Sequence, residues 1–234
     1  MTNVSLFIGT IAALPDSGRP TGMFKHPVSS SLHLGHAGFA GDEQADRRVH
    51  GGPEKAVHLY TATHYARLAQ AFPQRAGRLK PGSLGENISS PTLDESQVRI
   101  GEVFRLGNAR LQLCQPRNPC WKIDERSGTE GVAAFIARHQ LTGWYFRVLE
   151  PGTVSPGDPL AVVDAATEAP SLAEAMRLWE LHRPAPETLR QLAATPGIAA
   201  QWQRKIVERA DWLDRQLAQS GATAAAFHVK PEDR

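Results

Sequence analysis

The chain has little of several residue classes, and each shortage excludes a kind of protein. It contains 2 cysteines in 234 residues, too few for the disulfide framework of a small secreted domain. No segment approaches the roughly 18 consecutive apolar residues that a membrane-spanning helix needs. The net charge is only +2 and no block of lysine and arginine stands out. Neither a nucleic acid polymer nor a membrane is therefore indicated as a partner.

The N-terminal stretch "MTNVSLFIGTIAALPDSG" also lacks the features of a signal peptide. It has no basic region, and Gly9 and Thr10 interrupt its apolar run. This pattern predicts a strand that is followed by a turn at "PDSG". With two cysteines and no export signal, we expect the protein to be cytoplasmic.

Short apolar runs alternate with turn residues up to about residue 165. In "VRIGEVFRLGNARLQLCQP", two alternating runs flank Gly107-Asn108, which is a two-residue hairpin signal. The stretch "WYFRVLEPGTVSPGDPLAVV" repeats the pattern, with turns at "EPG" and "SPGD". Regular turns of this kind predict a barrel or a folded-over antiparallel sheet. Two helices, over "ATHYARLAQAF" and "GVAAFIARH", interrupt the strands.

After residue 170 the apolar period becomes helical. Ser171 and Glu174 form a capping box, and further helices are predicted after Pro186 and beyond Pro196-Gly197. We therefore expect a mainly β fold, a β-barrel-like domain with a few helices, plus a small all-α C-terminal domain. The predicted bounds are 1–168 (core about 29–165), 169–222 for three helices, and 223–234 for a disordered tail. Since three short helices cover one another only in part, we expect them to dock on the β-rich domain or on a second subunit, as in a homodimer.

Both cysteines lie in one stiff segment, "CQPRNPCWKI". Cys114 ends a predicted strand and fits a buried small hydrophobe. Cys120 follows Pro119 in a loop, with Arg117 and Lys122 nearby, and such cations favour the reactive thiolate. The spacing, with no second pair, argues against structural zinc or an iron–sulfur cluster. A single thiolate on a soft metal that a cofactor brings in fits better.

The densest charged stretch is "GFAGDEQADRRVHGGPEKAVHLY". It can be a solvated surface loop with ordinary salt bridges. However, Gly51 and Gly52 follow His50 and precede Lys55, and glycine N–H groups beside a lysine suit an oxyanion or phosphate. The spacing of a P-loop or a dinucleotide fingerprint is missing. In a third stretch, "LGENIS", an acid and Asn87 follow a glycine. By itself this stretch does not indicate a particular kind of site.

Taken together, the three segments are more specific. The stretches "GDEQADRRVHGGPEKAVHLY", "GSLGENIS" and "QPRNPCWKI", in this order and followed by three helices, resemble the MOSC family. This family is named after the C-terminal domain of molybdenum cofactor sulfurases. The chain is most similar to its YiiM-type branch, which carries an extra helical domain. The resemblance covers about 29–165 for the MOSC domain and about 170–220 for the helices.

The resemblance implies a molybdenum cofactor of the molybdopterin type, with one cysteine as the protein's metal ligand. Carried over to this chain, that ligand is Cys120 of "PRNPC", while Cys114 needs no role in the chemistry. The prolines would stiffen the loop. The candidate cofactor-binding residues are Lys55, His50, Gly51, Gly52, Asn87, Arg117, Asn118 and Cys120.

The resemblance also implies an activity, the reduction of N-hydroxylated compounds to amines, including detoxification of hydroxylaminopurine base analogues such as 6-hydroxylaminopurine. Cys120 would act through the metal, and His50 and His58 are the candidate proton donors. Because no flavin or NAD fingerprint is present, a separate flavin- or NAD(P)H-dependent reductase would supply electrons. Two alternatives stay open. One is a module that carries the cofactor or sulfur without turnover, and the other is a metal-free cysteine hydrolase.

Overall fold

The structure is a computed structural model, and it describes residues 2–46 and 51–220. The tail predicted for 223–234 lies outside these ranges. Within them, no helix is long and apolar enough to cross a membrane. The strands are β1 (Thr2–Asn3), β2 (Ser5–Ile8), β3 (Ala12–Ala13), β4 (Pro20–Thr21), β5 (His26–Pro27), β6 (Leu32–Gly35), β7 (Gly38–Phe39), β8 (Val57–Thr61), β9 (Ile88–Ser90), β10 (Val103–Leu106), β11 (Ala109–Pro116), β12 (Trp144–Glu150), β13 (Gly152–Val154) and β14 (Pro159–Asp164).

Six α-helices and two 3-10 helices complete the described part of the chain. They are η1 (Pro53–Lys55), α1 (Ala62–Ala71), η2 (Pro73–Arg78), α2 (Lys122–Ser127), α3 (Val132–Arg138), α4 (Leu172–Glu180), α5 (Pro186–Ala193) and α6 (Ala200–Ser220). Helices α1 and α3 coincide with the two segments that were predicted to interrupt the strands.

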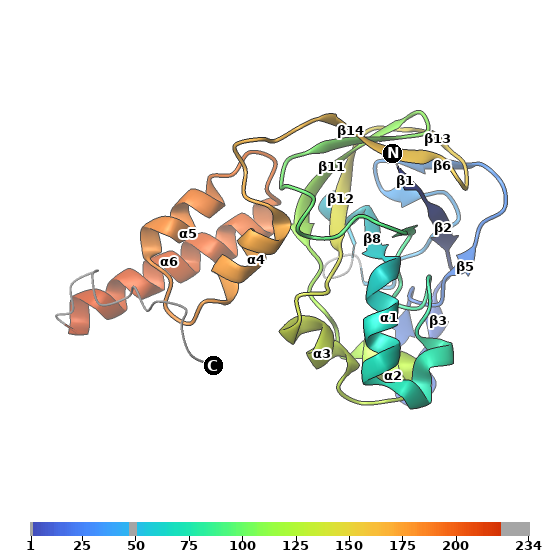
Figure 1. Ribbon diagram of the computed structural model, residues 1–234, viewed down its shortest axis with the longest axis horizontal. Helices are drawn as coiled ribbons and strands as arrows, with labels where there is room; N and C mark the ends of the chain where they lie inside the picture. The colour runs from blue at the N-terminus through green and yellow to red at the C-terminus, as the bar shows by residue number, and fades with distance from the viewer. Residues whose placement is uncertain (1, 47–50, 221–234) are drawn as a thin grey trace.

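A curled sheet of nine strands organises the β-rich part (Figure 1). Its order is β1-β14-β10-β11-β12-β8-β9-β2-β5. Strands β8 and β9 pair in parallel, whereas their neighbours in the sheet pair antiparallel. The predicted hairpin is confirmed, because Leu106 faces Ala109 across the turn at Gly107-Asn108. The mainly β fold is therefore confirmed, with a sheet that curls into a half-barrel.

Helices α1, α2 and α3 gather at one end of this sheet, below it in Figure 1. Their apolar residues form a small core of their own, in which Leu68, Ile123 and Ile136 are almost fully buried. Helix α2 begins directly after the Cys120 loop. Packing of its Ile123 in this core consequently fixes the position at which that loop leaves the sheet.

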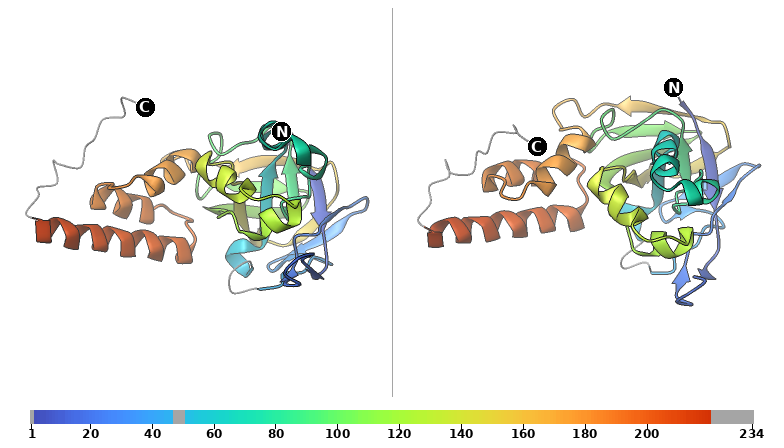
Figure 2. Two further views of the ribbon diagram at one scale, coloured as in Figure 1. Left: turned by 90° about the horizontal axis from the view of Figure 1, so that it is seen from below. Right: turned by 60° about the horizontal axis from the view of Figure 1, so that its bottom comes forward.

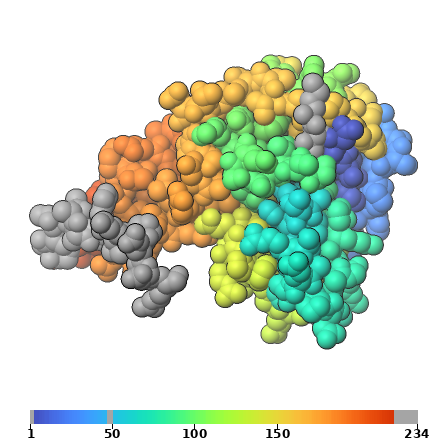
Figure 3. All heavy atoms as spheres, in the orientation of Figure 1, coloured from blue at the N-terminus to red at the C-terminus, as the bar shows by residue number. Residues whose placement is uncertain are grey.

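The three C-terminal helices lie to one side of the sheet (Figure 2) and form a separate lobe in the space-filling view (Figure 3). The capping box of α4 is present: the Ser171 side chain accepts from the Glu174 N–H, and the Glu174 carboxylate accepts from Ser171. One apolar cluster runs from sheet residues such as Leu113 to Leu172 and Ile206 of the helices. The helices therefore dock on the β-rich part of the same chain, one of the two arrangements expected from their apolar faces.

Candidate functional site

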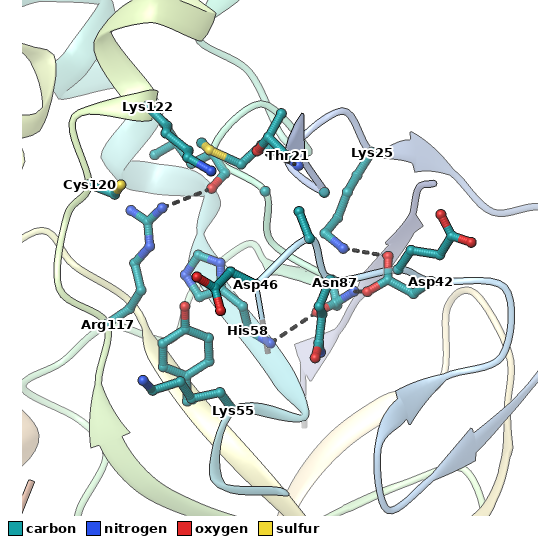
Figure 4. A pocket seen from close by; sticks show the side chains of 18 residues that line it. Thr21, Lys25, Asp42, Asp46, Lys55, His58, Asn87, Arg117, Cys120 and Lys122 are labelled. Carbon is teal, nitrogen blue, oxygen red and sulfur yellow. Dashed lines mark hydrogen bonds and ion pairs between the residues drawn. The ribbon is translucent and has the colours of Figure 1, made fainter. Parts of the chain in front are cut away.

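A pocket opens where the loops after β4, β7 and β11 meet strand β8 and the turn before β9 (Figure 4). Segments that are far apart in the sequence supply its walls. The lining residues are Thr21, Gly22, Met23, Lys25, Asp42, Glu43, Gln44, Ala45, Asp46, Lys55, His58, Leu84, Gly85, Asn87, Arg117, Cys120, Lys122 and Tyr145. Five of the predicted site residues line it, namely Lys55, His58, Asn87, Arg117 and Cys120; His50 lies outside the described residues.

Arg117 is a buried cation of the pocket, with an exposed fraction of 5%. Its backbone N–H donates to the Gly143 carbonyl (3.1 Å) and its Nη2 donates to the Leu84 carbonyl (3.3 Å). Its Nη1 is buried and has no hydrogen-bond partner among the described residues. A guanidinium stays charged at any relevant pH, and a buried charge is stable only when it is paired. Arg117 thus presents a buried N–H donor that is unused among the described residues.

Gly143 makes this arrangement possible. It has a φ of +64°, and a Cβ at this position would lie 2.2 Å from the Leu59 carbonyl oxygen. Glycine adopts this left-handed conformation at little cost. The chain can therefore run close against β8 and present the Gly143 carbonyl to the Arg117 N–H.

The two cysteines differ in their surroundings. Cys120 is half-buried and lines the pocket. Its carbonyl accepts from the Ile123 N–H (2.9 Å) at the start of α2. Cys114 is fully buried, its Sγ lies 3.1 Å from the Glu54 carbonyl oxygen, and burial raises the pKa of its thiol to about 12. Cys114 is therefore a neutral core residue, as the strand pattern predicted, and Cys120 is the cysteine that a ligand can reach.

The "LGEN" segment contributes Leu84, Gly85 and Asn87 to the pocket lining. Glu86 is fully buried, and its carboxylate accepts from the Tyr65 hydroxyl (2.6 Å) and from the N–H groups of Gly82 (2.6 Å) and Leu84 (3.1 Å). These bonds fix the turn whose Leu84 carbonyl receives Arg117. Burial raises the pKa of Glu86. This acid consequently shapes the site without entering it.

Asn87 belongs to a network in the pocket floor. Its amide donates to Asp42 Oδ2 (2.9 Å) and to the Phe7 carbonyl (3.3 Å), and its Oδ1 accepts from the His58 N–H (3.1 Å). Asp42 in turn forms an ion pair with Lys25 (Figure 4). The Asn87 side chain is therefore engaged by the protein, and it holds the floor in place.

His58 and Tyr145 stand side by side in the pocket, with ring centroids 5.3 Å apart. Burial, and after it the charge of Arg117, holds the pKa of His58 well below its ordinary value of 6.5. Burial also raises the pKa of Tyr145, although the charge of Arg117 and a hydrogen bond from it oppose this shift. Both groups are thus neutral near pH 7 and can act as hydrogen-bond partners of a neutral polar ligand.

The remaining predicted residues are spread around the site. Lys55 lines the pocket, and its Nζ donates to Gln201 Oε1 (3.1 Å). Burial, and then the charge of Lys205, lowers the pKa of Lys55. Gly51, Gly52 and the exposed Asn118 are not among the residues that line the pocket. In the described part of the structure, Lys55 is thus the residue of "HGGPEK" that lines it.

Lys25 and Tyr145 were not singled out from the sequence, and Asp42 was included only as a member of the densest charged stretch. Lys25 and Asp42 form their ion pair although 17 residues separate them in the chain, and Tyr145 reaches the site from β12. In the sequence, Asp42 is marked by the glycine before it and Tyr145 lies inside an apolar strand, features that many surface positions share, whereas Lys25 has neither. Tertiary structure, which brings these segments together, was needed to find them.

Within the described ranges there is no group of three or more histidine, cysteine, aspartate or glutamate side chains that could hold a metal ion. A site built from protein ligands alone would need such a group.

Comparisons with known proteins agree with this geometry. The MOSC domain family matches residues 46–161. Protein YiiM of Escherichia coli (strain K12) is 34% identical over 206 residues, which cover 88% of this chain and 91% of YiiM. The crystal structure of YiiM from Escherichia coli has a TM-score of 0.74 at 26% identity and covers 94% of both chains. A protein named reductase from Gibberella moniliformis (strain M3125 / FGSC 7600) is 29% identical over 143 residues, 61% of this chain and 25% of that protein.

The likeness to YiiM extends over the β-rich part and the C-terminal helices alike, since it takes in most of both chains. The chain therefore belongs to the MOSC-domain family, in the branch that YiiM represents.

Proposed function

We propose that this protein is a molybdenum-cofactor-dependent reductase that converts N-hydroxylated compounds, such as hydroxylaminopurine base analogues, to the corresponding amines. Membership of a family named after molybdenum cofactor sulfurase, and a similar protein named reductase, support this proposal. The overall reaction takes R–NH–OH, two electrons and two protons to R–NH2 and water. The electrons would come from a separate flavin- or NAD(P)H-dependent reductase.

The observation that carries the proposal is that Cys120 and Arg117 line the same pocket. A thiol is the soft ligand that molybdenum accepts. The unpartnered, buried Nη1 of Arg117 is a donor for the negative charge that a cofactor phosphate carries. Lys55 and Lys122 line the same pocket and add positive charge. The residues present thus fit a group that has a soft metal at one end and an anion at the other.

When bound, the cofactor would supply the two-electron transfer of an oxygen atom. The chain's own residues would orient the substrate and exclude water. Tyr145 and His58 stand in the pocket as neutral groups, so each can hydrogen-bond to the N-hydroxyl group without carrying charge into the site. Of the proton donors predicted from sequence, His58 lines the pocket, and Tyr145 is added from the structure.

The test is to purify the protein from a host that makes the cofactor, and to measure molybdenum and pterin per chain together with turnover. With reduced viologen as electron source, we expect one molybdenum and one pterin per chain and conversion of 6-hydroxylaminopurine to adenine. Molybdenum and pterin without turnover of any N-hydroxylated compound would instead identify a carrier. Hydrolytic activity that a thiol reagent blocks, in protein free of molybdenum, would identify a cysteine hydrolase.

A further inference from the structure

Gly143 is hydrogen-bonded at both ends of its main chain. Its N–H donates to Oε1 of Glu95 (2.7 Å), and its carbonyl accepts from the Arg117 N–H (3.1 Å). The glycine is also confined from the side, because a Cβ at this position would lie 2.2 Å from the Leu59 carbonyl oxygen and 3.3 Å from Nε2 of His58. The Glu95 carboxylate is thus connected to Arg117 of the pocket through a single, closely packed residue.

Glu95 is a buried acid, with an exposed fraction of 4%. Its other carboxylate oxygen, Oε2, lies 2.7 Å from Nε2 of His64 in the first turn of α1. An ionised carboxylate only accepts hydrogen bonds, so His64 is the donor. The Glu95 carbonyl accepts from the Ala173 N–H (2.8 Å) of α4. The main chain and the side chain of Glu95 are therefore both held, by α4 and by α1.

The guanidinium end of Arg117 depends on a second buried acid. Its Nη2 donates to the Leu84 carbonyl (3.3 Å), in the turn that the Glu86 carboxylate fixes through the N–H groups of Gly82 and Leu84. Arg117 is therefore held at its main chain through Glu95 and at its guanidinium through Glu86. Its Nη1 is buried without a hydrogen-bond partner among the described residues. The direction of this remaining donor depends on both supports.

The charge of Glu95 makes its support firm. Hydrogen bonds with an ionised partner are shorter and roughly twice as strong as those between neutral groups. A buried carboxylate also needs hydrogen bonds to compensate for its burial, and His64 supplies one of them. Loss of the charge or of the His64 donor would therefore loosen the Gly143 peptide, and with it the main chain of Arg117.

We propose that Glu95, oriented by His64, is a positioning residue for Arg117. It holds the Gly143 peptide so that the unused Nη1 donor of Arg117 meets the anionic, phosphate-type group of a bound cofactor. In the described part of the structure, neither Glu95 nor His64 lines the pocket, so both act through Gly143. This inference rests on the proposed function, because it assumes that the pocket binds an anionic cofactor.

The experiment measures how fast the cofactor leaves full-length protein that is purified from a host that makes it. Pterin per chain is followed over time after gel filtration in the wild type, Glu95→Gln, His64→Leu and His64→Gln. Glu95→Gln keeps an acceptor for the Gly143 N–H but removes the charge, and His64→Gln restores a donor that His64→Leu lacks. Urea unfolding shows whether each variant is folded.

Glu102→Gln is the matched control. Glu102 is buried to a similar degree (6% exposed), and its carboxylate also accepts from a backbone N–H, that of Arg99 (2.9 Å). Its neighbours Arg99 and Gly101 line a different cavity, between the sheet and the C-terminal helices. Glu95→Gln and Glu102→Gln are each also combined with Arg117→Met, because the effects of two changes that act through one group do not add.

We expect Glu95→Gln and His64→Leu to speed the loss of pterin about fivefold or more, as for one weakened hydrogen bond. His64→Gln and Glu102→Gln should lose pterin at the wild-type rate. Once Arg117→Met is present, Glu95→Gln should cause no further acceleration.

The same acceleration by Glu95→Gln with and without Arg117→Met would show a merely structural role and overturn the inference, as would a wild-type rate in Glu95→Gln. Both results leave the proposed function intact. Equal losses in His64→Gln and His64→Leu would overturn the part of His64. If His64→Leu does not fold, the comparison of Glu95→Gln with and without Arg117→Met decides. Wild-type protein that carries no pterin would overturn the proposed function, and this inference with it.

Discussion

At the scale of single residues, the pocket contains a buried charge that does not stabilise the fold. Arg117 is almost fully buried, and its Nη1 has no partner within the described residues. A buried charge that lacks compensation is costly, whereas an apolar side chain of similar size is not. The cost of keeping Arg117 is understandable if an anion occupies the site in the working protein.

Arg117→Met should therefore act in opposite directions on stability and on binding. In cofactor-free protein we expect a free energy of unfolding at least equal to that of the wild type, because the uncompensated charge is gone. The binding free energy of the cofactor should become less favourable by about 1.5–3 kcal/mol, the value of a hydrogen bond to a charged group. Urea unfolding and pterin content after gel filtration measure the two effects. A variant that keeps its pterin, or one that is clearly less stable, contradicts this role of Arg117.

His58 predicts a dependence of stability on pH. Its pKa in the folded protein lies well below 6.5, mainly through burial, so below about pH 6.5 the unfolded chain binds a proton that the folded protein does not. Stability must then fall as the pH decreases, by up to about 1.4 kcal/mol per pH unit. His58→Gln should remove this contribution between about pH 6.5 and 5. Urea unfolding at several pH values should show a shallower acid slope in the variant, and parallel slopes would contradict the assignment.

At the scale of elements, local signals predicted the fold better than the site. The hairpin at Gly107-Asn108 and the capping box of Ser171 and Glu174 are local, and both are present. Cys120 could be identified from the sequence as a candidate site residue because its motif is contiguous. By contrast, the pair of Lys25 and Asp42 and the contact of Lys55 with Gln201 join distant segments. Their partners depend on how the sheet curls and where α6 docks, which no local pattern contains.

Removal of the helices tests how the elements depend on one another. A chain cut after residue 168 would expose the apolar sheet surface that α4 and α6 cover, and leave Glu54 without the Ala200 N–H. Since full burial of one large apolar side chain is worth about 1.5–3 kcal/mol, we expect a loss of at least about 3 kcal/mol. Urea unfolding and solubility measure it, and an equally stable, soluble fragment of unchanged oligomeric mass would contradict the docking.

At the scale of the whole molecule, the proposed reaction requires an electron source from outside the chain. The sequence has no flavin or NAD fingerprint. Purified protein with NADH alone should therefore leave a hydroxylamine unreduced, and addition of a flavin reductase or reduced viologen should start turnover. Product formation is followed by chromatography. Turnover with NADH and no second protein would show that this chain binds a further redox cofactor.

The most direct measurement of the central claim is turnover per bound pterin in Cys120→Ser, with Cys114→Ser as its control. A hydroxyl is a hard, poorly ionised donor that does not replace a thiolate on molybdenum, and the change at a half-buried loop position opens no large cavity. We predict a folded Cys120→Ser protein that reduces no N-hydroxylated substrate. Cys114→Ser should lose stability, since Cys114 is fully buried, but keep its turnover per pterin. Wild-type rates in Cys120→Ser, or loss of chemistry only in a well-folded Cys114→Ser protein, would contradict the account.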